Sequence, residues 1–342
     1  MTAQQPWLSI LMPVHNAAPF LEVALRTILV QVRELRDSRG LPDSGTSVEL
    51  LCFNDGSTDG SPDILQRLQR EYADVMQVSD VSHSVGVSAA RNALLKAARG
   101  TYVWFLDADD ELAPGALNAV YRTIHEHEVD AVLCDYRVLR ERSGIKHRLR
   151  GEHHRRTFTG PSNTVLSNGS RILEGLFKAG QWHLWSKVVR RACWPEDLEF
   201  PVGRVFEDLA VAPRLLAGCS RVWHLPLPLV AYRSNSSSIL GTLNPNKVND
   251  WALALQGMSQ SLLLHNTNFD EPARQAMLNF LASRLLRVLR MAQRLNMPQQ
   301  WQENTVRECQ QASPALSQQI QSWKTQPRWW PAWFEARRRG LT

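Results

Sequence analysis

Residues 102–110 constrain the fold more than any other stretch: five aromatic or aliphatic side chains are followed by three aspartates within four positions. The apolar run is too short for a core helix, and its aromatic and β-branched content favours a strand buried on both faces. Such a strand brings Asp107, Asp109 and Asp110 together at the edge of a sheet. Clustered carboxylates raise one another's pKa unless a cation joins them, and Mg²⁺ or Mn²⁺ prefers carboxylate oxygen. The stretch predicts either a cation site or a solvated helix start, where acidic residues are also favoured.

Other apolar runs with strand character alternate with helical patterns along the first 140 residues. The predicted strands cover residues 8–14, 48–53, 75–81, 102–106 and 131–136, and the predicted helices cover 17–32, 62–72, 89–99 and 114–127. This alternation is typical of right-handed βαβ units. We therefore expect an α/β fold with a Rossmann-like, mostly parallel sheet that carries helices on both faces.

Two other predicted strands also end in polar residues. The first runs into Pro13-Val-His-Asn16 and the second into Asn54-Asp-Gly-Ser57. Ligands of such sheets bind beyond the carboxyl ends of the strands, so the three polar exits should share one rim. Acidic residues on that rim would repel nucleic acid. The net charge of +6 comes from the tail, because residues 272–342 hold eleven basic and three acidic residues.

Four motifs occur in a fixed order: Pro13-x-x-Asn16, Asp55-Gly-Ser-Thr-Asp59, Gly86-x-Ser-x-Ala-Arg-Asn92 and Gly100-x-Tyr-x-x-Phe-Leu-Asp-x-Asp-Asp110. As a set they resemble a family 2 glycosyltransferase of the GT-A fold. Three later motifs are similar to those of bacterial polysaccharide members: Trp185-x-Lys187, Glu207-Asp208 and Tyr232-Arg233. The resemblance covers residues 7–240.

The resemblance implies a nucleotide-sugar site and a divalent cation, Mn²⁺ or Mg²⁺. The implied nucleotide-sugar residues are Pro13, Asn16, Asp55, Gly56, Arg91, Asp107, Trp185, Lys187, Tyr232 and Arg233. Asp109 would be the first metal ligand, with Asp107 and Asp110 able to share the metal. Asp55 would accept a hydrogen bond from the base, a uracil ring in a UDP-sugar, and Gly56 would let the backbone approach the ligand.

The resemblance also implies the reaction: sugar transfer, with inversion, to a hydroxyl of a glycan or lipid-linked acceptor. Asp208, or its neighbour Glu207, would be the base that removes the hydroxyl proton. A nucleotidyltransferase acting on sugar phosphates is the alternative, although the first strand lacks the Gly-rich basic loop usual in that class. One departure is His15, which stands where the family usually has tyrosine. This substitution leaves the identity of the nucleotide open.

The outer parts of the sequence give less specific predictions. We expect a transferase domain over residues 1–240 and a helical extension over 241–342. The extension's clustered Trp and Arg predict either a helical bundle or an interfacial segment at an anionic membrane. The basic stretch 140–156 predicts a solvated hairpin or a flap over an anionic substrate. The N-terminus lacks an apolar signal core, so we expect a cytoplasmic protein, at most peripheral at the inner face of the membrane.

Overall fold

The computed structural model describes residues 5–37, 48–140, 151–234, 242–264, 269–339 and 341. The chain forms two compact units that interleave along the sequence. The first comprises residues up to 167 together with 183–203 and 218–235, and the second comprises 168–182, 204–217 and 236 onward. The expected domain boundary at residue 240 stays a prediction. Half of the basic stretch, residues 141–150, lies outside the described residues.

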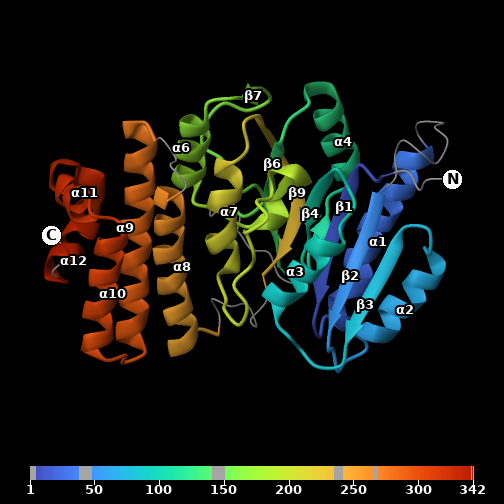
Figure 1. Ribbon diagram of the computed structural model, residues 1–342, viewed down its shortest axis with the longest axis horizontal. Helices are drawn as coiled ribbons and strands as arrows, with labels where there is room; N and C mark the ends of the chain where they lie inside the picture. Colours follow the sequence, from blue (N-terminus) through green and yellow to red (C-terminus); the bar gives the residue numbers. More distant parts are fainter. Residues whose placement is uncertain are drawn as a thin grey trace. The chain divides into compact units, whose positions relative to one another are not determined.

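The first unit contains the sheet and four long helices (Figure 1). Its strands are β1 (Leu8–Val14), β2 (Val48–Asp55), β3 (Met76–Val81), β4 (Tyr102–Phe105), β5 (Glu111–Leu112), β6 (Ala131–Leu139), β7 (Val165–Leu166), β8 (Lys187–Arg190) and β9 (Val222–Arg233). Its helices are α1 (Ala18–Asp37), α2 (Ser61–Glu71), α3 (Val87–Ala97) and α4 (Ala116–His127). The predicted βαβ alternation is confirmed through β6.

The strand order is β3-β2-β1-β4-β8-β6-β9-β5, with β7 paired to β9. The β3, β2, β1 and β4 strands are parallel, as predicted. The second half is mixed, because β8 lies between β4 and β6 and is antiparallel to both. Its residues had given no clear strand pattern, and their placement depends on backbone groups that β4 and β6 leave open. All the polar exits of the parallel half still lie at one edge of the sheet.

Alternating residues of β1 divide the sheet into two faces. Leu8, Ile10, Met12 and Val14 join one core with apolar side chains of α1, α2 and α4. On the other face Ser9 donates to Glu49, at 2.5 Å, and accepts from the backbone of Gly100. Helices therefore cover both faces, with α3 packed on β1 and β2. The buried sheet gives the strand exits a rigid base.

The predicted helix ends lie within two residues of the observed ones, except that α1 continues five residues past its predicted end at residue 32, to Asp37. Ser61 is the first residue of α2 rather than its cap, and its hydroxyl accepts from the Ala17 backbone instead. Ser88 lies inside α3, which follows Gly86. Long-range contacts thus outweigh the local capping preference.

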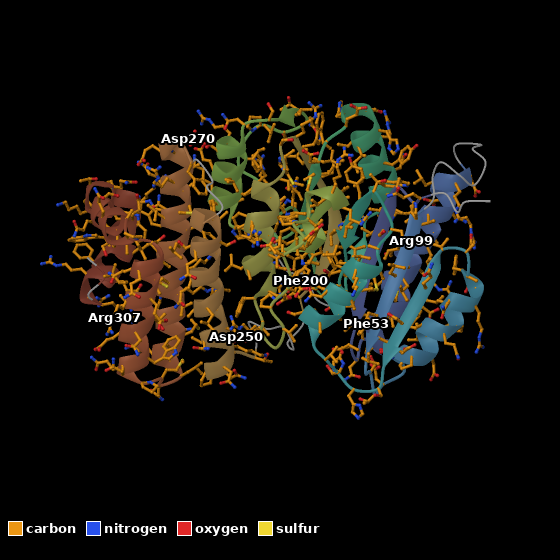
Figure 2. The ribbon with its side chains drawn as sticks, viewed as in Figure 1. Phe53, Arg99, Phe200, Asp250, Asp270 and Arg307 are labelled. Carbon is orange, nitrogen blue, oxygen red and sulfur yellow. The ribbon has the colours of Figure 1, made fainter. Side chains whose placement is uncertain are left out.

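The second unit is helical, as expected for the region beyond residue 241. It contains α6 (Gly169–Ala179), α7 (Glu207–Ala217), α8 (Pro245–Leu264), α9 (Glu271–Arg294), α10 (Gln299–Ala312), α11 (Leu316–Ser322) and α12 (Trp330–Arg338). Asp270 caps α9 by accepting from the Ala273 backbone, and Asp250 of α8 accepts from Val205 (Figure 2). The α7 helix continues through Pro213, although proline in a helix interior favours a kink or a break. Its buried apolar side chains offset the single backbone hydrogen bond that proline removes.

Candidate active site

The acidic loop after β4, residues 107–111, forms a tight turn held by the backbone of β9. The Asp110 N–H donates to the Asp107 carbonyl at 3.2 Å. Arg233, the last residue of β9, donates its backbone N–H to Asp110 Oδ1 at 2.7 Å. Its guanidinium donates to the Asp109 carbonyl and pairs with Glu111. Arg233 was implied to be a nucleotide-sugar residue, which stays a prediction; in the structure it fixes the loop that carries the aspartates.

Asp110 is buried, and only one of its two carboxyl oxygens is known to accept a hydrogen bond. Its second oxygen, Oδ2, is buried and has no hydrogen-bond donor in the part of the chain that the structure describes. Burial raises the pKa of Asp110 well above its usual range, and the nearby charges of Asp107 and Asp109 raise it further. Burial, followed by the same three aspartates, also raises the pKa of Tyr232 to about 12. The loop therefore concentrates negative charge that its own donors do not neutralise.

Arg91 supplies one cation to this loop. It projects from α3 and donates to Asp107 Oδ1 at 3.0 Å, and its side chain is almost entirely buried. The rings of Phe105 and Phe200 lie under its guanidinium. The sequence had left a choice between a ligand anchor and an ion pair with a rim aspartate. The structure contains the ion pair, which does not exclude contact with a ligand.

The loop after β2 is built differently, because its carboxylate is fully occupied. Asp55 is buried and accepts from the Ser84 hydroxyl at 2.8 Å and from the backbones of Val85 and Gly86 at 2.6 and 3.0 Å. Asp55 thereby ties the β3–α3 loop to the end of β2. Contact between Asp55 and a nucleotide base stays a prediction. The Gly86 motif was the sequence signal for this pairing, although it did not reveal the partner.

Gly56 follows Asp55 in the left-handed region, with φ of +59°. A Cβ there would lie 2.6 Å from backbone atoms of His83 and Ser84. The residue had been assigned to close approach of a ligand. The structure supplies another physical reason for glycine: the neighbouring loop leaves no room for a side chain.

His15 and Asn16 close the same rim above β1. Asn16, with φ of +49°, accepts from the Thr58 backbone at 2.8 Å through its side chain. His15 donates through Nδ1 to the Asp55 carbonyl at 2.6 Å. The residue that departs from the family pattern is therefore part of the β2 loop. Pro13 is in β1, in register with Phe53 of β2.

The predicted pocket residues Trp185 and Lys187 are buried in the first unit. Trp185 is 3% exposed and stacks with both Tyr232 and His183. Lys187 is 1% exposed and donates to the His183 carbonyl at 2.7 Å. The aromatic face expected to stack on a sugar thus packs against protein. Burial gives both residues a scaffolding role, and their contact with substrate stays a prediction.

Glu207 and Asp208 open α7 in the second unit, where helix N-termini favour acidic side chains. Phe206, just before them, has φ of +64°, a conformation that is unfavourable for a bulky residue. Its ring stacks on Trp251 of the same unit at 4.9 Å. The stacking contact offsets the backbone strain and fixes the start of the helix. Glu207 is buried, and Asp208 is more exposed.

The acidic loop fits a hard divalent cation. Asp110 Oδ2 is buried without a donor among the described residues, the raised pKa shows that the charged form of this carboxyl is disfavoured unless a cation is nearby, and oxygen ligands suit Mg²⁺ and Mn²⁺. Within the described ranges, no group of three or more His, Cys, Asp or Glu side chains is arranged to enclose a metal. Mg²⁺ commonly takes one or two carboxylates and completes its shell with water and substrate phosphates. Asp107, Asp109 and Asp110 therefore do not form a complete set of three metal ligands in this structure, and a bound cation stays a prediction.

Comparison with known proteins agrees with this geometry. Residues 9–175 match the family described as Glycosyl transferase family 2, so this region is a family 2 glycosyltransferase domain. The glycosyltransferase EpsJ of Bacillus subtilis is 26% identical over 248 residues, 68% of this chain and 63% of EpsJ. A poly(ribitol-phosphate) β-glucosyltransferase of Bacillus spizizenii is 31% identical over 126 residues, 37% of this chain and 18% of that enzyme. The chain thus spans less than two thirds of either relative.

The fold also has a counterpart among solved structures. The S. aureus TarS 1-349 structure in complex with UDP superposes with a TM-score of 0.69, covering 98% of this chain and 88% of that one at 19% identity. The similarity extends over both units and confirms the expected GT-A class with its helical extension. Among the described residues, no helix is both long and apolar enough to cross a bilayer.

Proposed function

We propose that this glycosyltransferase moves a sugar from a UDP-sugar to a hydroxyl of a glycan or lipid-linked acceptor during cell-surface polysaccharide synthesis. The single observation that carries the proposal is the acidic loop after β4, with its buried, unneutralised Asp110 oxygen. UDP is the first nucleotide to test because TarS, a protein of the same fold, binds it. A glycan acceptor is favoured because one relative acts on poly(ribitol-phosphate).

In the proposed mechanism the β4 loop binds the diphosphate of the donor. Asp109 and Asp107 would hold Mn²⁺ or Mg²⁺, with Asp110 behind them. When bound, such a cation acts as a Lewis acid that stabilises the charge developing on the leaving nucleoside diphosphate. Arg91 keeps Asp107 in place, and Arg233 keeps the Asp109–Glu111 backbone in place. The rigidity of the loop keeps the carboxylates oriented, so little reorganisation is needed during transfer.

The acceptor hydroxyl requires a base. We assign Asp208, with Glu207 as its neighbour, to remove that proton as the hydroxyl attacks the anomeric carbon. One displacement of this kind inverts the anomeric centre. Pro13, Asn16 and Asp55 would form the nucleotide end of the site.

Thermal unfolding with nucleotide sugars and Mn²⁺ tests the donor directly. A donor at about 100 times its Kd stabilises the folded state by about 2.7 kcal/mol, so a UDP-sugar should raise Tm where UDP-free sugars do not. The Asp109→Ala protein should lose the Mn²⁺-dependent part of that shift. An equal shift with and without Mn²⁺, or the same shift in Asp109→Ala, would contradict the cation assignment.

The base is tested separately by Asp208→Asn and Glu207→Gln. Asp208→Asn should retain the donor-induced Tm shift and lose turnover by about 10²- to 10⁴-fold. Glu207→Gln is the matched neighbour and should retain more activity. Unchanged turnover in Asp208→Asn would move the base elsewhere. The product's anomeric configuration, read by NMR, checks inversion.

A further inference from the structure

The end of the second unit carries an exposed face that the transfer reaction does not use. Among the described residues, seven large hydrophobic side chains are exposed, and the two aromatic ones are Trp330 and Phe334. Both are on α12, where they are 48% and 53% exposed. They are four residues apart, so they lie on the same side of the helix.

Basic residues continue the same face. Arg337 and Arg338 follow Trp330 by seven and eight positions, which places them beside the two aromatic rings. An open hollow of ≈ 610 Å³ is lined by Phe334, Arg337 and Arg338. The opposite side of the helix is occupied by packing, since Ala336 is buried. The helix is therefore amphipathic with an aromatic and basic outer face.

The acidic charge of this segment is neutralised within the bundle. Glu335 is the single acidic residue between 323 and 339, against five basic ones. It pairs with Arg290 of α9 at 3.3 Å and with Arg339 at 3.2 Å. Arg337 and Arg338 have no acidic partner in the described residues, so the outer face keeps its positive charge.

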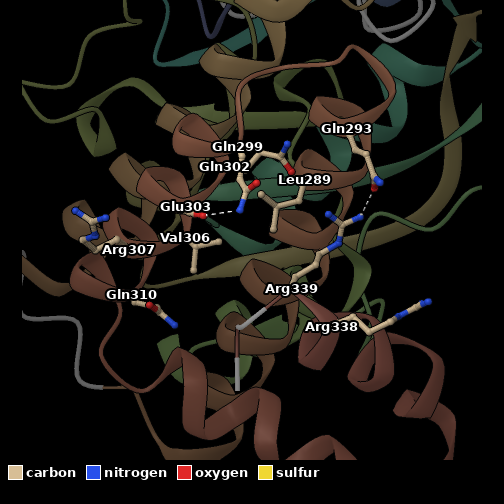
Figure 3. A pocket seen from close by; sticks show the side chains of 10 residues that line it. All are labelled: Leu289, Gln293, Gln299, Gln302, Glu303, Val306, Arg307, Gln310, Arg338 and Arg339. Carbon is tan, nitrogen blue, oxygen red and sulfur yellow. Dashed lines mark hydrogen bonds between the residues drawn. The ribbon is translucent and has the colours of Figure 1, made fainter.

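Figure 3 shows how Arg338 and Arg339 differ. Arg339 turns inward and donates to Gln293, at 3.1 Å, in a polar pocket between α9, α10 and α12. Arg338 lines the edge of the same pocket and also lines the hollow beside Phe334, and no hydrogen bond joins it to the other pocket residues drawn in Figure 3. The pocket's polar groups largely bond to one another, as when Gln299 donates to Glu303 at 2.8 Å. The hydrogen bonds in this pocket stabilise the bundle, whereas the outer face of α12 remains available to a partner.

The tryptophans at the start of α12 and just before it differ in their surroundings: one is buried in the bundle and another is exposed. Trp323 is fully buried, donates to Asn279 of α9 and stacks on Trp329 at 4.7 Å. Trp330 instead keeps its ring at the surface while its N–H donates to the Lys324 carbonyl at 2.9 Å. The bundle interpretation of this segment thus accounts for Trp323 and leaves Trp330 and Phe334 unexplained.

We propose that the face of α12 formed by Trp330, Phe334, Arg337 and Arg338 docks on an anionic phospholipid surface. Exposed aromatic rings bury their apolar area at the level of lipid headgroups, and Arg side chains pair with the phosphates. A soluble anionic polymer would satisfy the arginines without requiring two exposed aromatic rings. The proposal concerns binding alone, so it can fail while the proposed sugar transfer holds.

Vesicle sedimentation of the full chain tests the proposal. The protein should bind phosphatidylcholine vesicles that contain phosphatidylglycerol, and binding should fall with added salt and without the anionic lipid. The double change R337Q/R338Q should weaken binding by about 25-fold, since each basic residue near the surface adds about a factor of five. The matched control Arg307→Gln, on α10, should leave vesicle binding unchanged.

The aromatic half is tested by W330S/F334S, with Val202→Ser as the control for an exposed apolar residue elsewhere. W330S/F334S should weaken binding to anionic vesicles while Val202→Ser does not, and circular dichroism should show unchanged folding. Absence of binding to anionic vesicles would overturn the proposal, as would binding that is indifferent to either set of changes. Concentration-dependent dimerisation lost in W330S/F334S, without vesicle binding, would assign the face to a second copy of the chain.

Discussion

Two strands on either side of β1, β2 and β4, each end near a buried aspartate, and the two aspartates are paired very differently. At the end of β2, Asp55 accepts three hydrogen bonds from the β3–α3 loop. Beyond β4, Asp110 accepts one backbone hydrogen bond, and its other oxygen has no donor among the residues that the structure describes. The first carboxylate completes the fold, whereas the second leaves charge for a ligand to neutralise. The residue type alone therefore does not show whether a buried aspartate stabilises the fold or is available to a ligand.

The largest expected effect tests the β4 exit. Asp109→Ala should lower sugar transfer by about 10²- to 10³-fold, because a cation's stabilisation of the leaving diphosphate is worth several kcal/mol. The fold should persist, since Asp109 is partly exposed in the loop. Initial rates with and without EDTA give the measurement. Full activity in excess EDTA would remove the cation from the proposed mechanism.

The same isosteric substitution, aspartate to asparagine, should affect stability differently at the two strand exits. Asp55→Asn should destabilise the protein by about 3 kcal/mol. The carboxylate accepts three charge-assisted hydrogen bonds, whereas the amide is uncharged and replaces one acceptor oxygen with an NH₂ donor. Asp110→Asn should cost less than about 1 kcal/mol or be stabilising in the absence of metal, because it removes a buried like charge. Urea unfolding in EDTA measures both. Equal destabilisation would show that the two carboxylates have the same structural role.

Glycine substitutions sharpen the comparison at the β2 exit. Gly56→Ala should destabilise by about 2 kcal/mol more than Gly86→Ala, although both residues have positive φ. The added methyl meets the His83 backbone at 2.6 Å in the first case and nothing within 4 Å in the second. Thermal unfolding of the two proteins isolates the steric part from the shared backbone strain. Similar losses would mean that the neighbouring loop moves aside.

The smallest effect is expected at His15. His15→Tyr restores the residue usual in the family and removes the hydrogen bond to the Asp55 carbonyl. Stability should change by about 1 kcal/mol or less, because His15 is exposed. Donor titrations with UDP- and GDP-sugars would then show whether this position affects nucleotide choice. A loss of several kcal/mol would make His15 an essential part of the β2 exit.

The sequence by itself determined the parallel half of the sheet and the location of the acidic loop. Apolar runs of strand length between helical patterns define βαβ units, and strand ends in parallel sheets meet at one edge. The ordered motifs gave the family for the same reason, since their spacing is local along the chain. The prediction weakened at β8, whose pairing with β4 and β6 depends on distant backbone groups.

The tertiary structure alone decided which predicted site residues have open functional groups. Asp55, Arg233 and Trp185 carry the expected residue types, but each is engaged by protein partners from other segments. Partners that lie 30 to 120 residues away leave no periodic signal in a sequence. The same holds for α12, where only the packing of Ala336 and Trp323 shows which side of the helix stays exposed. Local spacing in the sequence specifies helices, strands and motifs. Whether a polar group already has a hydrogen-bond partner within the protein is decided only when the chain folds.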